Sequence, residues 1–166
     1  MTLKHIVLIG MPSSGKSSIG KILADKLRFN FIDGDDLLVE RFGKKLSEII
    51  SEVGEERFIE LEGAEFLHLG LEKPTVLAPG GSLVYSHEAM LHLTEIAEII
   101  YLDTPLREIE MRIPDSVARG IIGAKDKTLA QLYDERVVLY KKYATKTVDN
   151  AKVRPTIVAE RILAII

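Results

Sequence analysis

The chain has 166 residues, a length that suits one domain, and its 46% apolar and 28% charged residues are typical of a globular fold, not of a disordered or fibrous chain. The net charge of -3 argues against bulk attraction to nucleic acid or to an anionic membrane. The absence of cysteine excludes disulfides, thiolate metal sites and cysteine nucleophiles, and suits a reducing cytoplasm. The first apolar run, residues 5–9, is too short for a signal peptide or a membrane helix, so we expect a cytoplasmic protein. We also expect the protein to be a monomer.

Short apolar runs rich in β-branched residues alternate along the chain with longer segments of helical period. The runs, which are expected to be strands, are residues 6–9, 29–32, 75–78, 99–102 and 147–148. Two apolar helical faces accompany them, one formed by Ile19, Ile22, Leu23 and Leu27 and the other by Val158, Ile162 and Ile165. This alternation predicts a single α/β domain over residues 1–166, a three-layer αβα fold with about five parallel strands.

One long segment without a clear period, residues 113–127, contains Pro114, Gly120 and Gly123. It falls in a basic region, because residues 105–154 have a net charge of +4 whereas the rest of the chain has -7. The basic region could be a solvated face, and the loop could be merely mobile. Because the two coincide, we expect a mobile lid at about residues 113–127 that closes over an anion.

Residues 10–17, Gly-Met-Pro-Ser-Ser-Gly-Lys-Ser, match the phosphate-binding pattern GxxxxGK[ST] between an expected strand and an expected helix. The glycines allow successive N–H groups to point at phosphate oxygens, and the helix start adds its positive end. Lys16 is expected to reach the β- and γ-phosphates of a nucleoside triphosphate, and Ser17 to ligate Mg²⁺. The alternative, a chance match, arises in about one per cent of such chains or fewer. The expected nucleotide contacts of this loop are Ser13, Ser14, Gly15, Lys16, Ser17 and Ser18.

A cluster of carboxylates, Asp33, Asp35 and Asp36, follows the second expected strand. Ligands of open parallel sheets bind beyond the carboxyl ends of the strands, so this cluster is expected beside the phosphate loop. A helix N-cap with solvated acids is the alternative, and it accounts for Asp36 more easily than for Asp33 and Asp35. The further acidic residues at 55–65 are expected on the solvated face of a helix.

With these motifs the sequence resembles the shikimate kinase family over essentially its whole length. The resemblance rests on the phosphate loop, on the Phe-x-Asp-x-Asp element at residues 31–35 and on partial matches to further motifs. Those partial matches are residues 54–62 (Gly-Glu-Glu-Arg-Phe-Ile-Glu-Leu-Glu), 78–82 (Ala-Pro-Gly-Gly-Ser), 119–122 (Arg-Gly-Ile-Ile) and 136–140 (Arg-Val-Val-Leu-Tyr). The resemblance implies a P-loop kinase similar to nucleoside-monophosphate kinases, which uses ATP and Mg²⁺ in aromatic amino acid biosynthesis.

The resemblance also implies roles for single residues around the transferred phosphoryl group. Asp33 resembles the residue that holds Mg²⁺ through a water, and Asp35 resembles the residue that orients the acceptor hydroxyl and takes its proton. Arg119 resembles the lid arginine that swings over the phosphoryl group. Arg112 resembles an arginine that stacks on adenine, and Arg154 lies in the segment that forms the adenine-binding loop of the relatives.

Substrate contacts are implied for Gly80, Gly81 and Ser82, and Gly81 resembles the glycine whose backbone N–H contacts the substrate. Arg136 can also be argued from the pattern alone, because residues 128–144 have a helical period that places it in an apolar stripe. An arginine in such a stripe is seldom buried without an anionic partner. The partner could be an acidic residue of the chain, or the carboxylate or phosphate of a ligand, which the guanidinium fork suits.

The sequence departs from the family motifs on the acceptor side and in the lid. Ile59 replaces an arginine that contacts the substrate carboxylate, and Arg57 cannot take its place because two residues turn a helix by about 200°. Losing that contact should cost about 2–4 kcal/mol for a carboxylated acceptor and should be harmless for a neutral one. Ser82 adds a side chain at the border of the glycine loop, and Gly120 replaces a proline of the lid.

The sequence therefore predicts an ATP- and Mg²⁺-dependent kinase that phosphorylates a hydroxyl of a small metabolite, with Lys16, Asp35 and Arg119 as catalytic residues. Shikimate is the leading acceptor. The departures favour, as an alternative, a different hydroxylated metabolite. A nucleotide-binding regulator without catalysis is a third hypothesis, but such a protein has no need of a proton acceptor or of a lid arginine.

Overall fold

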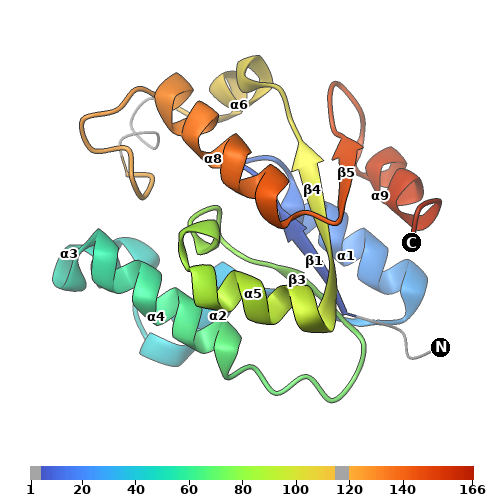
Figure 1. Cartoon of the computed structure of the whole chain (residues 1–166), viewed down its shortest axis with the longest axis horizontal. Coiled ribbons are helices and arrows are strands. Elements are labelled where there is room, and N and C mark those ends of the chain that lie inside the picture. Colours follow the sequence, from blue (N-terminus) through green and yellow to red (C-terminus); the bar gives the residue numbers. More distant parts are fainter. Residues whose placement is uncertain (1–4, 115–119) are drawn as a thin grey trace.

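The computed structural model of the protein describes residues 5–114 and 120–166, and its centre is a five-stranded sheet (Figure 1). The strands are β1 (His5–Ile9), β2 (Asn30–Asp33), β3 (Thr75–Ala78), β4 (Ala97–Asp103) and β5 (Lys146–Asp149). Their order is β2-β3-β1-β4-β5, and every pairing is parallel. Each predicted strand is present, although β4 begins two residues earlier than predicted and β5 is longer at both ends.

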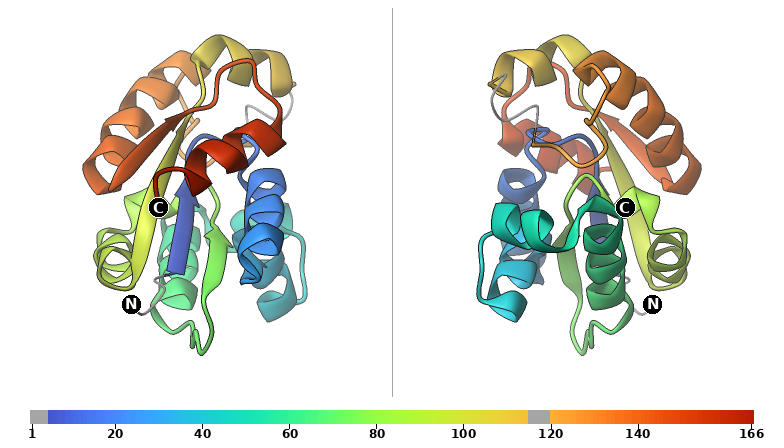
Figure 2. Two further views of the ribbon diagram at one scale, coloured as in Figure 1. Left: turned by 90° about the vertical axis from the view of Figure 1, so that its right-hand side faces the viewer. Right: turned by 90° about the vertical axis from the view of Figure 1, so that its left-hand side faces the viewer.

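Helices cover both faces of the sheet (Figures 1 and 2). In chain order they are α1 (Lys16–Leu27), α2 (Gly34–Phe42), α3 (Leu46–Val53), α4 (Glu55–Leu67), the 3-10 turn η1 (Leu83–Tyr85), α5 (His87–Ile96), α6 (Leu106–Arg112), α8 (Leu129–Tyr143) and α9 (Pro155–Leu163). Helices α1 and α9 pack on one face, whereas α4, α5 and α8 pack on the other. The predicted three-layer αβα architecture is confirmed.

Strand β1 shows how the two apolar layers arise from the sequence. Successive side chains of a strand point to opposite faces of the sheet. Val7 and Ile9 pack into the cluster that contains α5 and α8, whereas Ile6 and Leu8 pack into the cluster that contains α1 and α9. All four side chains are at most 3% exposed. A continuous apolar run is therefore what a parallel strand covered on both sides requires.

Helix α8 carries the apolar stripe that the sequence predicts. The Thr128 side chain caps it by accepting a hydrogen bond from the Gln131 amide, and the helix ends at Tyr143, one residue before the predicted end. Its buried residues recur at helical spacing, and they are Leu132, Arg136, Tyr140 and Tyr143. The stripe thus brings a guanidinium group to the inner side of the helix.

A third, smaller apolar cluster lies at one end of the sheet, between α2, α3 and α4. Its buried members are Leu38, Ile49, Phe58 and Ile122. At the start of α2, a Cβ atom on Gly34 would lie only 2.8 Å from the Cα atom of Pro79. Glycine therefore allows α2 to approach the loop after β3, which places Asp35 next to that loop.

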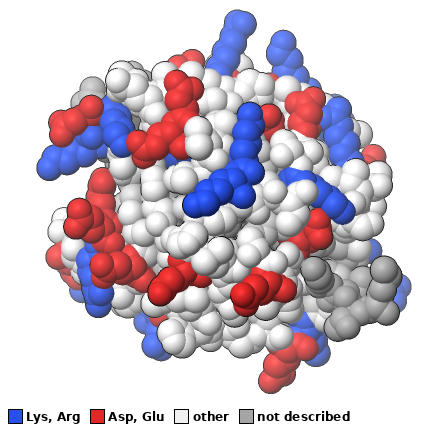
Figure 3. All heavy atoms as spheres, in the orientation of Figure 1, with Lys and Arg blue, Asp and Glu red and all other residues white. Residues whose placement is uncertain are grey.

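Charged side chains of both signs are spread over the face of the molecule shown in Figure 3. The exposed ion pairs of the molecule include Lys44 with Glu52 at 2.7 Å and Arg57 with Glu60 at 2.5 Å. Exposed pairs contribute at most about 1 kcal/mol each, so the fold depends mainly on its apolar clusters. Within residues 5–114 and 120–166, no helix has both the length and the apolar character that are needed to cross a bilayer.

Candidate active site

The phosphate loop turns from the end of β1 into the start of α1, as its sequence predicts. Gly15 adopts a φ of 90°, which favours glycine, and Lys16 is the first residue of the helix. The Lys16 ammonium is buried and donates hydrogen bonds to the carbonyl oxygens of Gly10 and Met11, both at 2.9 Å. Burial lowers the pKa of Lys16 to about 8. The side chain is therefore positively charged at neutral pH and lies within the loop that would hold a polyphosphate.

Ser17 and Asp33 lie together beside this loop, because the Ser17 hydroxyl donates a hydrogen bond to Oδ2 of Asp33. The other oxygen of Asp33 accepts from the Asp35 amide at 3.0 Å, so the N-cap of α2 is Asp33. Asp36 lies exposed in the first turn of the helix, as the alternative of a cap with solvated acids describes, and the cap itself is Asp33. Hydroxyl and carboxylate oxygens are hard ligands, and this pair fits the predicted Mg²⁺ position.

The described residues contain no group of three or more acidic or histidine side chains that could hold a metal ion. Mg²⁺ commonly binds through few protein oxygens, with substrate phosphates and water completing its coordination. The pair of Ser17 and Asp33 therefore suits a metal shared with a nucleotide better than a metal held by the protein alone.

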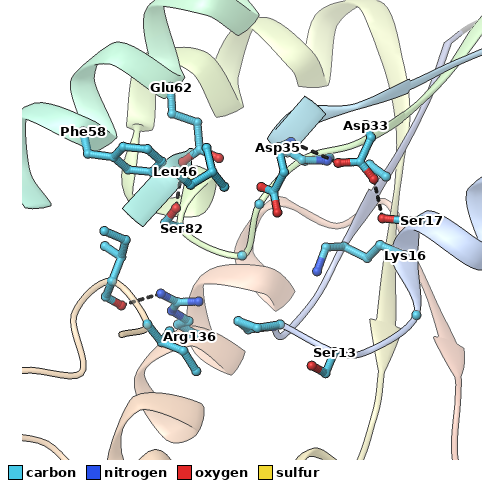
Figure 4. A pocket seen from close by; sticks show the side chains of 18 of the residues that line it. Ser13, Lys16, Ser17, Asp33, Asp35, Leu46, Phe58, Glu62, Ser82 and Arg136 are labelled. Atoms are coloured by element: carbon cyan, nitrogen blue, oxygen red, sulfur yellow. Dashed lines mark hydrogen bonds between the residues drawn. The ribbon is translucent and has the colours of Figure 1, made fainter. Parts of the chain in front are cut away.

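Asp35 projects from the first turn of α2 toward the centre of the pocket, where Lys16 lies across from it (Figure 4). Partial desolvation, followed by the nearby charge of Asp33, raises the pKa of the Asp35 carboxyl, while Lys16 opposes this effect. A carboxylate with a raised pKa is better suited to accept a proton from an alcohol than an unperturbed one. The predicted proton acceptor thus lies opposite the predicted phosphate-binding lysine.

A single pocket of about 420 Å³ joins these groups to the acceptor side. At its nucleotide end lie Ser13, Gly15, Lys16, Ser17 and Ser18 of the phosphate loop. At its other end lie Gly80, Gly81, Ser82 and Arg136, so the predicted substrate contacts are brought together with Asp35. Ser14, also predicted as a nucleotide contact, is buried beneath the loop, and its carbonyl faces Asn150.

Arg136 is 1% exposed and has no acidic partner in the part of the chain that the structure describes. Its Nη2 donates to the carbonyl of Ile122, its Nε lies 3.4 Å from the Tyr85 hydroxyl, and its guanidinium stacks over the Tyr85 ring. Its Nη1 has no hydrogen-bond partner among the described residues. This arrangement favours the ligand interpretation of Arg136 over an internal ion pair.

Glu62 is a site residue that sequence reasoning placed wrongly. It lies on the buried side of α4 between Phe58 and Phe66, is 0% exposed, and accepts a hydrogen bond from the Ser82 hydroxyl at 2.7 Å. Burial raises the pKa of Glu62 to about 7. Phe58 and Phe66 flank it at helical spacing, a signal that would have predicted a buried carboxyl on the pocket side and not on the solvated face.

Hydrogen bonds also connect the phosphate loop to the region predicted to bind adenine. Arg112 donates to Glu108 at 2.8 Å and to the carbonyl of Ser13 at 3.2 Å. Asn150, which the sequence did not single out, donates to the carbonyl of Ser14 and to the hydroxyl of Thr104, both at 2.7 Å. Arg112 thus lies beside the loop, as a nucleotide contact requires.

Arg154 and the lid are placed less completely. Arg154 is the exposed residue before α9 and caps the helix with its backbone carbonyl. The lid residue Arg119 lies outside the described residues. Residues 120–127, the last part of the segment predicted to be a lid, reach the acceptor side, where Ile121 and Ile122 line the pocket and the Gly123 amide donates to Glu55 at 3.0 Å.

Ile59 does not line the pocket but packs against the third apolar cluster, beside Phe58 and Ile122. It lies three residues before Glu62 and therefore on the same side of α4. The side chain that replaces the arginine of the family motif thus supplies packing and no charge. The carboxyl of Glu62 has no basic partner from this helix.

Comparisons with known proteins find similar sequences and a similar structure over most of the chain. A sequence model described as "Shikimate kinase" matches residues 12–166. The "Shikimate kinase" of Persephonella marina is 34% identical over 138 residues, which are 83% of this chain and 84% of that protein. The "Shikimate kinase" of Thermodesulfovibrio yellowstonii is 33% identical over 163 residues, which are 97% of this chain and 94% of that protein.

A solved structure, "Shikimate kinase from Acinetobacter baumannii in complex with shikimate", superposes on the fold with a TM-score of 0.89. It is 27% identical to this chain, and the alignment covers 98% of this chain and 92% of that one. The similarity therefore extends over the sheet, the phosphate loop and the acceptor side together.

Proposed function

Because the chain belongs to the shikimate kinase family, we propose that it transfers the γ-phosphoryl group of ATP to a hydroxyl of shikimate. Enzymes of this family are phosphotransferases that act on a hydroxyl group and use ATP with Mg²⁺. The observation that carries the proposal is the single pocket in which Lys16 faces Asp35 and which continues to Arg136. This pocket is large enough for the reacting ends of a nucleotide and a small acceptor.

The phosphate loop and the start of α1 supply backbone N–H groups, and Lys16 supplies a positive charge, for the β- and γ-phosphates. Ser17 and Asp33 would hold Mg²⁺, which neutralises phosphate charge when it is bound. Of the arginines, Arg119 is proposed to stabilise the transferred group and Arg112 to stack on adenine. Arg154 is proposed to lie at the adenine loop.

On the acceptor side, Asp35 orients the reacting hydroxyl and accepts its proton. The carboxylate of the acceptor binds Nη1 of Arg136, and the backbone of Gly80 and Gly81 approaches its ring. The chemistry needs little beyond positioning and charge neutralisation, because phosphoryl transfer passes through a loose transition state.

Coupled ADP-release kinetics with shikimate test the proposal. We expect shikimate-dependent ADP release that Asp35→Asn lowers by about 10²–10⁴-fold, with ATP affinity retained, because the amide cannot accept the proton. Asp36→Asn is the matched control, since Asp36 is exposed and does not line the pocket. Equal turnover by Asp35→Asn and the wild type would remove the assignment of Asp35.

The same assay separates the alternatives. A nucleotide-binding regulator would bind ATP and release no ADP with any acceptor. A kinase for a different hydroxylated metabolite, which Ile59 favours, would turn over another acceptor faster than shikimate. We further propose a cytoplasmic monomer, in keeping with the cysteine-free composition, and light scattering of the purified chain tests the monomeric state.

A further inference from the structure

The acceptor end of the pocket contains two buried ionisable groups, the carboxyl of Glu62 and the guanidinium of Arg136, each with an atom left free. Glu62 is 0% exposed and Arg136 is 1% exposed. Oε1 of Glu62 and Nη1 of Arg136 have no hydrogen-bond partner among the described residues, although the other carboxylate oxygen accepts from Ser82 and Nη2 donates to Ile122. Buried polar atoms without partners are costly, so their presence in a pocket indicates that a ligand supplies the missing partners.

Both free atoms face the loop of adjacent glycines at the base of the pocket. A Cβ atom on Gly80 would lie 2.7 Å from Oε1 of Glu62 and 3.3 Å from Oδ1 of Asp35. A Cβ atom on Gly81 would lie 2.7 Å from Nη1 of Arg136. Figure 4 shows Glu62, Asp35 and Arg136 around this loop, with Lys16 beyond Asp35. The three side chains therefore approach one short stretch of backbone, and all three line the same pocket.

The guanidinium of Arg136 and the carboxyl of Glu62 determine which chemical groups a ligand of this pocket would carry. Arg136 offers N–H donors, which suit a carboxylate. Glu62 offers a carboxylate oxygen, which accepts hydrogen bonds and binds a cationic donor best. Helix α4 supplies no such cation, because the residue one turn earlier is Ile59. Ser82 lies beside it, and since its O–H already donates to Glu62, its oxygen remains an acceptor for the same donor.

We propose that this site phosphorylates a second class of acceptor, hydroxylated amino acids, whose ammonium group binds Glu62 and Ser82 while the carboxylate binds Arg136. This further activity rests on the proposed kinase function and extends it beyond shikimate, which has no cationic group. The ammonium supplies the positive charge beside Glu62 that Ile59 does not supply. A zwitterion thus leaves neither buried charge unpaired.

The reaction is the same transfer as for other alcohols. The side-chain hydroxyl oxygen of the amino acid forms a bond to the γ-phosphorus of ATP, and the bond from that phosphorus to the β–γ bridging oxygen breaks. ADP leaves with the electron pair of the broken bond. The hydroxyl proton passes to Asp35 and then to solvent, so the products are the phosphorylated amino acid, ADP and a proton.

Coupled ADP-release kinetics of the full chain with matched acceptors test the proposal. The probes are L-homoserine with 4-hydroxybutyrate, and L-serine with 3-hydroxypropionate, each pair differing only in the ammonium group. We expect ADP release with at least one of the amino acids, at a kcat/KM about tenfold or more above that of its ammonium-free partner. Glu62→Gln should reduce this ratio toward one, and circular dichroism checks that the variant is folded.

Shikimate in a parallel assay separates the two proposals. Turnover of shikimate without turnover of either amino acid overturns the second acceptor class and leaves the proposed function in place. An amino acid and its ammonium-free partner that react equally well overturn the role of Glu62. Since this comparison uses the wild-type protein, it holds even if Glu62→Gln fails to fold. No ADP release with any acceptor overturns both proposals.

Discussion

The buried carboxyl of Glu62 makes the stability of the protein depend on pH, and one substitution can isolate the effect. Burial raises the pKa of Glu62 from its ordinary 4.5 to about 7, against the opposing hydrogen bond from Ser82. The charge of Asp35 raises this pKa further, whereas Arg136 and Lys16 lower it. The folded state therefore favours the protonated form of this carboxyl.

The sign of the effect follows from proton binding in the two states. Between about pH 4.5 and about pH 7 the unfolded chain has lost the Glu62 proton while the folded chain keeps it, so the free energy of unfolding falls as the pH rises. The contribution is fully present below the unfolded pKa and is lost above the folded one. A pKa difference of about 2.5 corresponds to a contribution of about 3 kcal/mol to the free energy of unfolding. About 2 kcal/mol of this contribution is lost between about pH 5 and about pH 7.5.

Urea unfolding of the wild type and of Glu62→Gln at these two pH values measures the effect. The amide is neutral at both and keeps an oxygen for the Ser82 hydrogen bond. At about pH 5 we expect the free energies of unfolding of the two proteins to agree within about 1 kcal/mol. At about pH 7.5 we expect the free energy of unfolding of the variant to exceed that of the wild type by about 2 kcal/mol. Working below pH 8 keeps Lys16 protonated in the folded state, because its pKa is about 8.

Glu60→Gln is the matched control, since Glu60 lies on the same helix, is exposed and pairs with Arg57. Its stability should follow that of the wild type at both pH values within about 1 kcal/mol. A stability difference between Glu62→Gln and the wild type that stays constant with pH would refute the reasoning from burial.

Three further substitutions test other parts of the site. Lys16→Ala should lower acceptor-dependent ADP release by about 10²–10³-fold with every acceptor, and retained turnover would contradict the role of the phosphate loop. Ile59→Arg should lower the KM for shikimate by about 30-fold or more, because the added guanidinium reaches the acceptor side beside Glu62 and restores a contact of about 2 kcal/mol or more. An unchanged or higher KM would count against this. Asn150→Ala should cost about 1–3 kcal/mol in urea unfolding and raise the KM for ATP, because it leaves the buried carbonyl of Ser14 unpaired; an unchanged KM would limit Asn150 to a structural role.

Local sequence patterns predicted the parts of the fold that depend on local chemistry. The apolar runs of the central strands reflect cover on both faces, as β1 shows with Val7 and Leu8 in opposite layers, whereas the edge strand β5 buries only Val148. The turn of the phosphate loop into α1 was predicted, since its glycines and Lys16 act within a few residues of one another, but the burial of Ser14 beneath the loop was not. The stripe of α8 predicted Arg136 as a buried cation from periodicity alone.

The pairings in the site between residues that are distant in sequence could not be predicted from local patterns. Glu62 is paired with Ser82, which is 20 residues away, and Asn150 contacts Ser14 across 136 residues. Such pairs depend on which helix covers which end of the sheet. Asp33 illustrates a different difficulty, because its carboxylate both caps α2 and contacts Ser17. A sequence pattern that indicates one of these roles does not indicate that the same residue also has the other.

The small apolar cluster around Phe58 and Ile122 is separate from the two layers that hold the sheet. Substitutions within it change the shape and charge of the wall that meets the alcohol, and the strands beneath keep their packing. The ATP-binding half, by contrast, is anchored in the central strand, where few replacements are tolerated. Evolution can therefore alter the choice of alcohol in single steps in this fold, while the machinery that delivers phosphate stays the same.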